Sequence, residues 1–166
     1  MVDCRQSLWN LFYNNCSTLR AAIQVKCMNF CFFLPKKERK RAENATRGIT
    51  MSVEIYKILQ KALISRSLSV AVGDEGGFAP NLSDDEEALE LICRAIEESG
   101  YDTNHVKIAL DCAASEWYTE DGIYRMPKRQ KQYNRMELIE YWERLARKYP
   151  IFSMEDGLDQ RDFEGW

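Results

Sequence analysis

The feature that most constrains the fold is the alternation, from residue 49 onward, of short β-type runs with longer amphipathic segments. Apolar residues three or four positions apart predict helices over residues 49–65, 83–99 and 134–149. The β-type runs are "LSVAVG" at 68–73, "VKIALD" at 106–111 and "IFSME" at 151–155. Strands that alternate with helices predict right-handed βαβ units and a parallel sheet. The predicted fold class is therefore α/β.

Individual residues predict the ends and buried faces of these helices. In the second helix, Ser83 and Glu86 are predicted to form a capping box, and Gly100 is predicted to end the helix. The third helix is predicted to end before Pro150. The segment between the second strand and the third helix, which contains Gly122 and Pro127, is predicted to be a loop. The predicted apolar faces are Ile49, Val53, Tyr56, Leu59 and Leu63 in the first helix, and Leu138, Tyr141, Trp142 and Leu145 in the third.

Charge and cysteine spacing exclude several classes of protein. The net charge of −3 is too small to indicate nucleic acid or a membrane surface as a partner, and no apolar run is long enough to span a bilayer. The start of the chain lacks the pattern of a secretory signal. The six cysteines match no zinc pattern, so they are expected to be reduced thiols in a cytoplasmic protein. Residues 1–34 show no clear periodicity and are assigned to no domain.

Carboxylates stand at the carboxyl end of every predicted strand. Asp74 and Glu75 follow the first, Asp111 ends the second, and Glu155 and Asp156 end the third. The carboxyl ends of the strands of a parallel α/β barrel converge on one face, where the active site lies. Carboxylates gathered there repel one another unless a cation such as Mg²⁺ is bound. At any single position a helix cap or a turn is the commoner explanation, and that alternative stays open for each of them.

Three stretches carry a resemblance to a known family. "VGDEGGFAPNL" at 72–82, "ALDCAASEWY" at 109–118 and "YPIFSMEDGLDQRDFEGW" at 149–166 resemble enolase, the phosphopyruvate hydratase. The resemblance covers residues from about 49 to 166, and "FFLP" at 32–35 is a weaker continuation. It implies a partial enolase-type TIM barrel over residues 35–166, a fragment of the C-terminal barrel domain of the family. Residues 1–34 do not resemble the family.

The resemblance also implies a reaction and a set of site residues. Enolases dehydrate 2-phosphoglycerate to phosphoenolpyruvate in glycolysis, act as homodimers, and use two Mg²⁺ ions with a lysine base, as enolase-superfamily sites do. By motif, Glu75 matches the glutamate of the acid/base machinery. Asp111 and Glu155 match two of the three ligands of the tightly bound Mg²⁺. Asp74 and Asp156 are expected to orient the residues around them.

The chain departs from the family in ways that limit its expected activity. No residue matches the lysine base, its partner lysine, the third metal carboxylate or the phosphate-binding Ser-Arg segment, and "KCMNFCFFLP" at 26–35 lacks a glutamate of the family. The Mg²⁺ site is therefore expected to be weak or incomplete, and the chain alone is expected to be inactive. The alternative is a non-catalytic enolase remnant or binding module.

Overall fold

The structure is a computed structural model that describes residues 45–73, 76–126 and 130–166. The predicted segment 1–34 lies outside these residues. The described elements, in chain order, are α2 (Ala45–Ser65), α3 (Asp85–Glu98), β1 (Ile108–Asp111), the 3₁₀-helix η1 (Ala114–Trp117), β2 (Tyr124–Met126), β3 (Lys131–Tyr133), α4 (Arg135–Lys148) and β4 (Ile151–Glu155). They form an α/β fold, as predicted, and correspond to part of an α/β barrel. Over these ranges, no helix is both long enough and apolar enough to cross a membrane.

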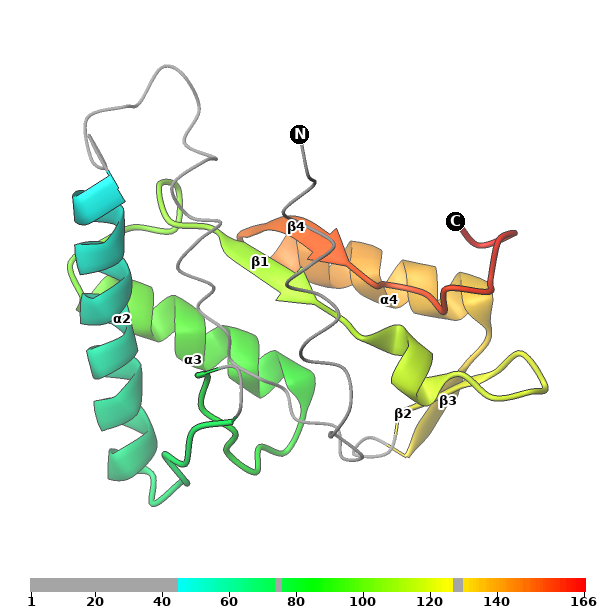
Figure 1. Cartoon of the computed structure of the whole chain (residues 1–166), viewed down its shortest axis with the longest axis horizontal. Helices are drawn as coiled ribbons and strands as arrows, with labels where there is room; N and C mark the ends of the chain where they lie inside the picture. The colour runs from blue at the N-terminus through cyan, green and yellow to red at the C-terminus, as the bar shows by residue number, and fades with distance from the viewer. Residues whose placement is uncertain (1–44, 74–75, 127–129) are drawn as a thin grey trace, which may run out of the picture.

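Two strands far apart in the sequence form the parallel sheet. β1 pairs with β4, and the register sets Asp111 opposite Glu155. The chain passes from β1 to β4 through η1, the β2–β3 pair and α4. Figure 1 shows β1 and β4 side by side, with α4 running alongside β4 and α2 lying across α3. The predicted parallel pairing is confirmed for these two strands.

The first predicted strand, residues 68–73, is wrong in the described part of the chain. Val72 makes only an isolated antiparallel bridge with Phe78. The backbone N–H of Gly73 donates to the Gly77 carbonyl (2.9 Å), and that of Ala79 donates to the Ala71 carbonyl (3.1 Å). Because a local turn satisfies these backbone groups, the segment has no need of a neighbouring strand. Asp74 and Glu75, at the tip of this turn, lie outside the described residues.

The second helix is confirmed, but its capping residues are one position later than predicted. Asp84 is the N-cap, in an extended conformation, and its side chain accepts the Glu87 N–H at 2.9 Å. Glu87 in turn accepts the N–H and the hydroxyl of Ser83 at 2.8 and 2.7 Å. The end at Gly100 is confirmed: with φ +79°, it donates to the Glu97 carbonyl, as expected of a left-handed C-terminal cap.

The first helix is confirmed, but part of its predicted buried face is wrong. Ile49 and Val53 are 54% and 42% exposed. The buried row instead has a spacing of four residues and consists of Met51, Ile55, Leu59 and Leu63. This row packs with Leu91, Ala95 and Ile96 of α3. The helix is apolar on two adjoining sides, and its packing on α3 selects the side that is buried.

The predicted loop after β1 contains regular structure. η1 is followed by the antiparallel pair β2–β3. In β2, buried Tyr124 and Met126 flank exposed Arg125, which is the alternation typical of a half-buried strand. A run of three residues is too short for this pattern to stand out in the sequence.

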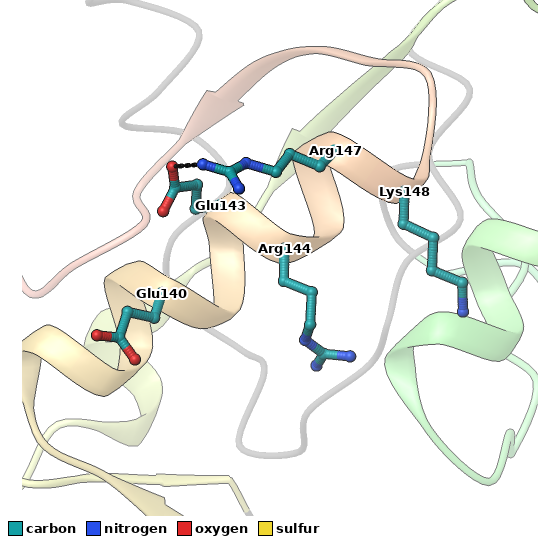
Figure 2. Close-up of a pocket in the computed structure, with 5 residues that line it drawn as sticks. All are labelled: Glu140, Glu143, Arg144, Arg147 and Lys148. Atoms are coloured by element: carbon teal, nitrogen blue, oxygen red, sulfur yellow. Dashed lines mark hydrogen bonds and ion pairs between the residues drawn. The ribbon is translucent and has the colours of Figure 1, made fainter.

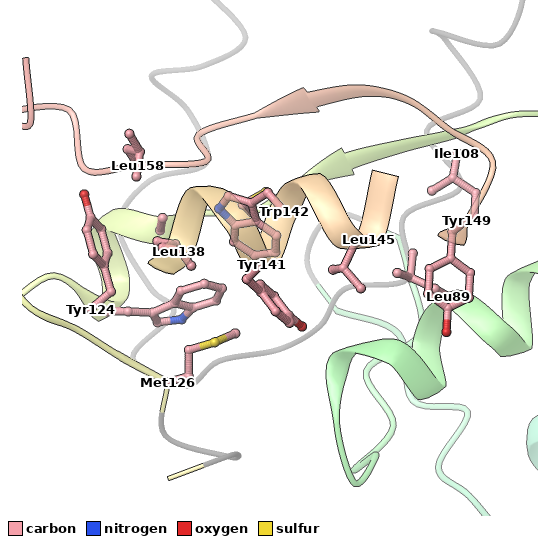
Figure 3. Close-up of a cluster of buried hydrophobic side chains, with 13 residues drawn as sticks. Leu89, Ile108, Tyr124, Met126, Leu138, Tyr141, Trp142, Leu145, Tyr149 and Leu158 are labelled. Carbon is pink, nitrogen blue, oxygen red and sulfur yellow. The ribbon is translucent and has the colours of Figure 1, made fainter. Parts of the chain in front are cut away.

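Two groups of buried side chains form the core, and α3 contributes to both. The sheet cluster lies between α4, the parallel strands and β2 (Figure 3). The helix cluster lies between α2 and α3. Leu89 of α3 belongs to the sheet cluster, and Ile92 packs against both. All four residues predicted for the apolar face of the third helix are buried in the sheet cluster, which is confirmed as the face that covers the sheet: Leu138, Tyr141, Trp142 and Leu145.

Candidate functional site

The carboxyl ends of β1 and β4 bring two predicted site residues together. Asp111 is the last residue of β1 and Glu155 is the last residue of β4, and the two are paired in the parallel register. The pairing continues past both strands, because the Cys112 N–H donates to the Glu155 carbonyl (3.0 Å) and the Ala114 N–H donates to the Asp156 carbonyl (2.9 Å). The predicted proximity of Asp111 and Glu155 is therefore confirmed.

Both carboxylates lie at the surface of the strand ends. The side chains of Asp111 and Glu155 belong to exposed residues. One oxygen of Asp111, Oδ1, accepts the backbone N–H of Ala113 at 3.2 Å. This bond fixes the orientation of the Asp111 carboxylate relative to the strand that carries it.

The thiol of Cys112 reports how much negative charge gathers here. Burial raises the pKa of this thiol, and the neighbouring carboxylates of Asp111, Asp156, Asp85 and Glu155 raise it further. Asp85 comes from the start of α3, far from the strand ends in sequence. In the sequence it is evident only as a charge suited to a helix N-terminus. The fold therefore adds a fourth carboxylate to the surroundings of Cys112.

The chemistry of the donors suits a hard divalent cation in part. Carboxylate oxygens are the ligands that Mg²⁺ takes from proteins, and one or two of them can hold the ion when it keeps several waters. Asp111 and Glu155 supply two such groups. Within residues 45–73, 76–126 and 130–166, no three His, Cys, Asp or Glu side chains are grouped so as to hold a metal ion. The third candidate, Glu75, lies outside these ranges.

A buried polar network that the sequence analysis missed fixes the loop after β4. Asp159 and Asp162 are only 2% and 3% exposed. The Tyr124 hydroxyl donates to Oδ2 of Asp162 (2.9 Å) and accepts the Asp159 N–H (3.0 Å), and Arg135 pairs with Oδ1 of Asp162 at 2.5 Å. Burial acts to raise the pKa of Asp162, but the bonds from Arg135 and Tyr124 prevail and lower it. No periodicity marks these residues, and only Asp159 and Asp162 share a motif, "DGLDQRDFEGW".

Further bonds connect this loop to its surroundings. The indole N–H of Trp142 donates to the Gly157 carbonyl at 2.8 Å, and the Gln160 N–H donates to the Ser115 hydroxyl at 3.3 Å. The first bond anchors the loop to α4 and the second to η1, which follows β1. The segment that follows Glu155 is therefore held in place from several sides.

The pockets of the described surface lie away from the strand ends. One runs along α4 and is lined by Glu140, Glu143, Arg144, Arg147 and Lys148 (Figure 2). Its cations already have partners, because Arg147 pairs with Glu143 at 2.5 Å, while Arg144 and Lys148 pair with Glu86 at 3.2 and 2.7 Å. This surface is a solvated helix face that helps to join α4 to α3.

One comparison with known proteins identifies the family. Residues 28–166 match the family model described as the enolase C-terminal TIM barrel domain. The matched range includes both strand ends and the loop after β4, and it begins upstream of the three motifs that carry the resemblance. The chain therefore belongs to the enolase C-terminal TIM barrel domain family.

Proposed function

We propose that this chain carries part of the active site of a phosphopyruvate hydratase, which dehydrates 2-phosphoglycerate to phosphoenolpyruvate. The observation that supports this most is the pairing of Asp111 with Glu155 at the carboxyl ends of two parallel strands, in a chain of the enolase barrel family. In the proposal these two carboxylates bind Mg²⁺. When bound, the ion stabilises negative charge on the carboxylate of the substrate.

The proposed roles of the residues follow the requirements of the reaction. The substrate loses the proton on C2 and the hydroxyl on C3, which leave together as water. Glu75 is proposed to give a proton to the departing hydroxyl. The residues of this chain include no match to the lysine that takes the C2 proton in the family. We therefore expect turnover only where a second polypeptide supplies that base. Glycolysis, a cytoplasmic location and the homodimeric state of the family belong to the same proposal.

A non-catalytic binding module is the second candidate. It is favoured by the small number of ligands, since only two of the proposed metal and acid/base carboxylates are among the described residues, and no metal-binding group of three is found there. Such a protein would keep a weak Mg²⁺ site without turnover. Formation of phosphoenolpyruvate, followed by its ultraviolet absorbance with and without Mg²⁺, separates the two candidates. Mg²⁺-dependent product formation by the chain alone would contradict the binding-module proposal.

The metal site itself is tested by titrating the isotope-labelled chain with MgCl₂ and following backbone amides by NMR. Because an ion with two protein carboxylates keeps most of its waters, we expect a dissociation constant of about a millimolar or weaker. Asp111→Ala is expected to abolish this binding and, by removing like-charge repulsion, to stabilise the metal-free chain slightly. Glu98→Ala, an exposed acid at the end of α3, is the matched control. Equal binding by the parent and Asp111→Ala would show that Asp111 is not a ligand.

A further inference from the structure

Two residues with left-handed backbone conformation flank the paired carboxylates. Ala113 has φ 46° and ψ 41°, and Asp156 has φ 52°. Neither is a glycine, and for alanine this conformation is unfavourable because its Cβ approaches the backbone. Such conformations persist only where the surrounding structure imposes them, and they gather at functional sites. Asp156 directly follows the end of β4, and Ala113 comes two residues after the end of β1.

The hydrogen bonds on either side of Ala113 impose its conformation. The Cys112 N–H donates to the Glu155 carbonyl and the Ala114 N–H donates to the Asp156 carbonyl, at 3.0 and 2.9 Å. Between these two bonds, the N–H of Ala113 turns toward Oδ1 of Asp111. The left-handed turn therefore joins the two strand ends and, at the same point, provides the donor that orients the Asp111 carboxylate.

Neither side-chain packing nor helix capping accounts for the conformation of Ala113. The residue is exposed, so packing of its methyl group does not require the left-handed turn. It precedes η1 at the N-cap position, but it makes no side-chain capping bond. What the position supplies is a backbone N–H aimed at a carboxylate.

We propose that Ala113 is a positioning residue for the metal site, and that its left-handed conformation holds the Asp111 carboxylate beside Glu155. This inference rests on the proposed function. It predicts that a residue that resists the left-handed conformation will weaken Mg²⁺ binding by the folded protein, beyond any loss of stability.

The test compares Ala113→Val with Ser67→Val. Ser67 is also exposed and left-handed, with φ 56°, but it lies in the turn after α2 and is far from the strand ends in sequence. Valine strains both positions, so both variants are expected to lower the midpoint of urea unfolding. Only Ala113→Val is expected to weaken Mg²⁺ binding, by about fivefold or more. Ala113→Gly, which adopts this conformation without strain, is expected to bind at least as well as the parent.

Equal Mg²⁺ affinity of folded Ala113→Val and Ser67→Val would overturn the inference. Should Ala113→Val not fold, the parent protein still decides: the amide signal of Ala113 is expected to shift with MgCl₂ more than that of Ser67, and no difference between them would overturn the inference. Failure of the proposed function has another signature, because Asp111→Ala would then bind Mg²⁺ as the parent does, or the parent would not bind it at all.

Discussion

At the level of single residues, the hydroxyl of Tyr124 joins two parts of the loop after β4. It donates to Asp162 and accepts the N–H of Asp159. Tyr124→Phe keeps the ring in the sheet cluster but leaves both buried partners without this bond. We expect the free energy of unfolding to fall by about 1–3 kcal/mol. Tyr133→Phe is the control, because in the described part of the chain the Tyr133 hydroxyl makes no hydrogen bond. Urea denaturation measures both, and equal losses would contradict the assigned role.

A second residue, Glu86, is expected to make stability depend on pH. The hydrogen bond from Lys148, aided by the charges of Lys148 and Arg144 and the Tyr149 hydroxyl, lowers its pKa from 4.5 to about 2, although burial opposes this. A carboxyl with a lower pKa in the folded state stabilises the protein above the unfolded pKa of 4.5, and the benefit is lost as the pH falls toward about 2.

Glu86→Gln tests this expectation. The parent should have the higher thermal midpoint at pH 7, and the difference from Glu86→Gln should narrow as the pH falls from about 4.5 toward 2. Glu98→Gln, which alters an exposed acid near the other end of α3, should show no such narrowing. A difference between the parent and Glu86→Gln that is independent of pH would show that the ion pairs add nothing to folding.

At the level of elements, the start of α4 depends on a reciprocal pair of hydrogen bonds. Asn134 Oδ1 accepts the Glu137 N–H at 3.0 Å, and Glu137 accepts the Asn134 N–H at 2.8 Å. Asn134→Ala should therefore lower the free energy of unfolding by about 1 kcal/mol. Asn134→Ser should restore most of it, since serine caps helices well. An unchanged midpoint in Asn134→Ala would show that packing alone fixes this end of α4.

The elements that could be predicted are those in which several local signals agree. In α4, the apolar period, the polar residue before it and Pro150 after it all indicate the same helix. The buried face of α2 could not be predicted in full, because the rows that begin at Ile49 and at Met51 are both apolar. Only packing on α3 selects between them. The strand predicted at 68–73 failed because its backbone groups are satisfied by a local turn.

The candidate site divides in the same way. The proximity of Asp111 and Glu155 could be predicted, because parallel strands bring their carboxyl ends together. The Tyr124–Asp162–Arg135 network could not, because its members come from β2, the last loop and α4, and no local pattern links them. The roles of Asp111 and Glu155 as ligands and of Glu75 as an acid stay predictions.

At the level of the whole molecule, α3 links the two parts of the core. Leu89 packs in the sheet cluster, Leu91 packs in the helix cluster, and Ile92 touches both. Outside the core, Arg144 and Lys148 of α4 pair with Glu86 of α3. Loss of either cluster therefore removes contacts that the other one uses, which favours unfolding as a single unit.

The same architecture leads us to expect self-association. In the described part of the chain, β1 and β4 pair only with each other, and strands at the edge of a sheet tend to pair with other chains. Large apolar side chains also face solvent: Val72 is 55% exposed, Met136 60%, Trp166 66% and Phe163 83%. Sedimentation velocity over a range of concentrations should show a growing fraction of larger species. Phe163→Ser should reduce this fraction while changing the free energy of unfolding by no more than about 0.5 kcal/mol, because the ring is the most exposed of the four. A parent chain that stays monomeric at all concentrations and unfolds in one cooperative transition would contradict the expectation.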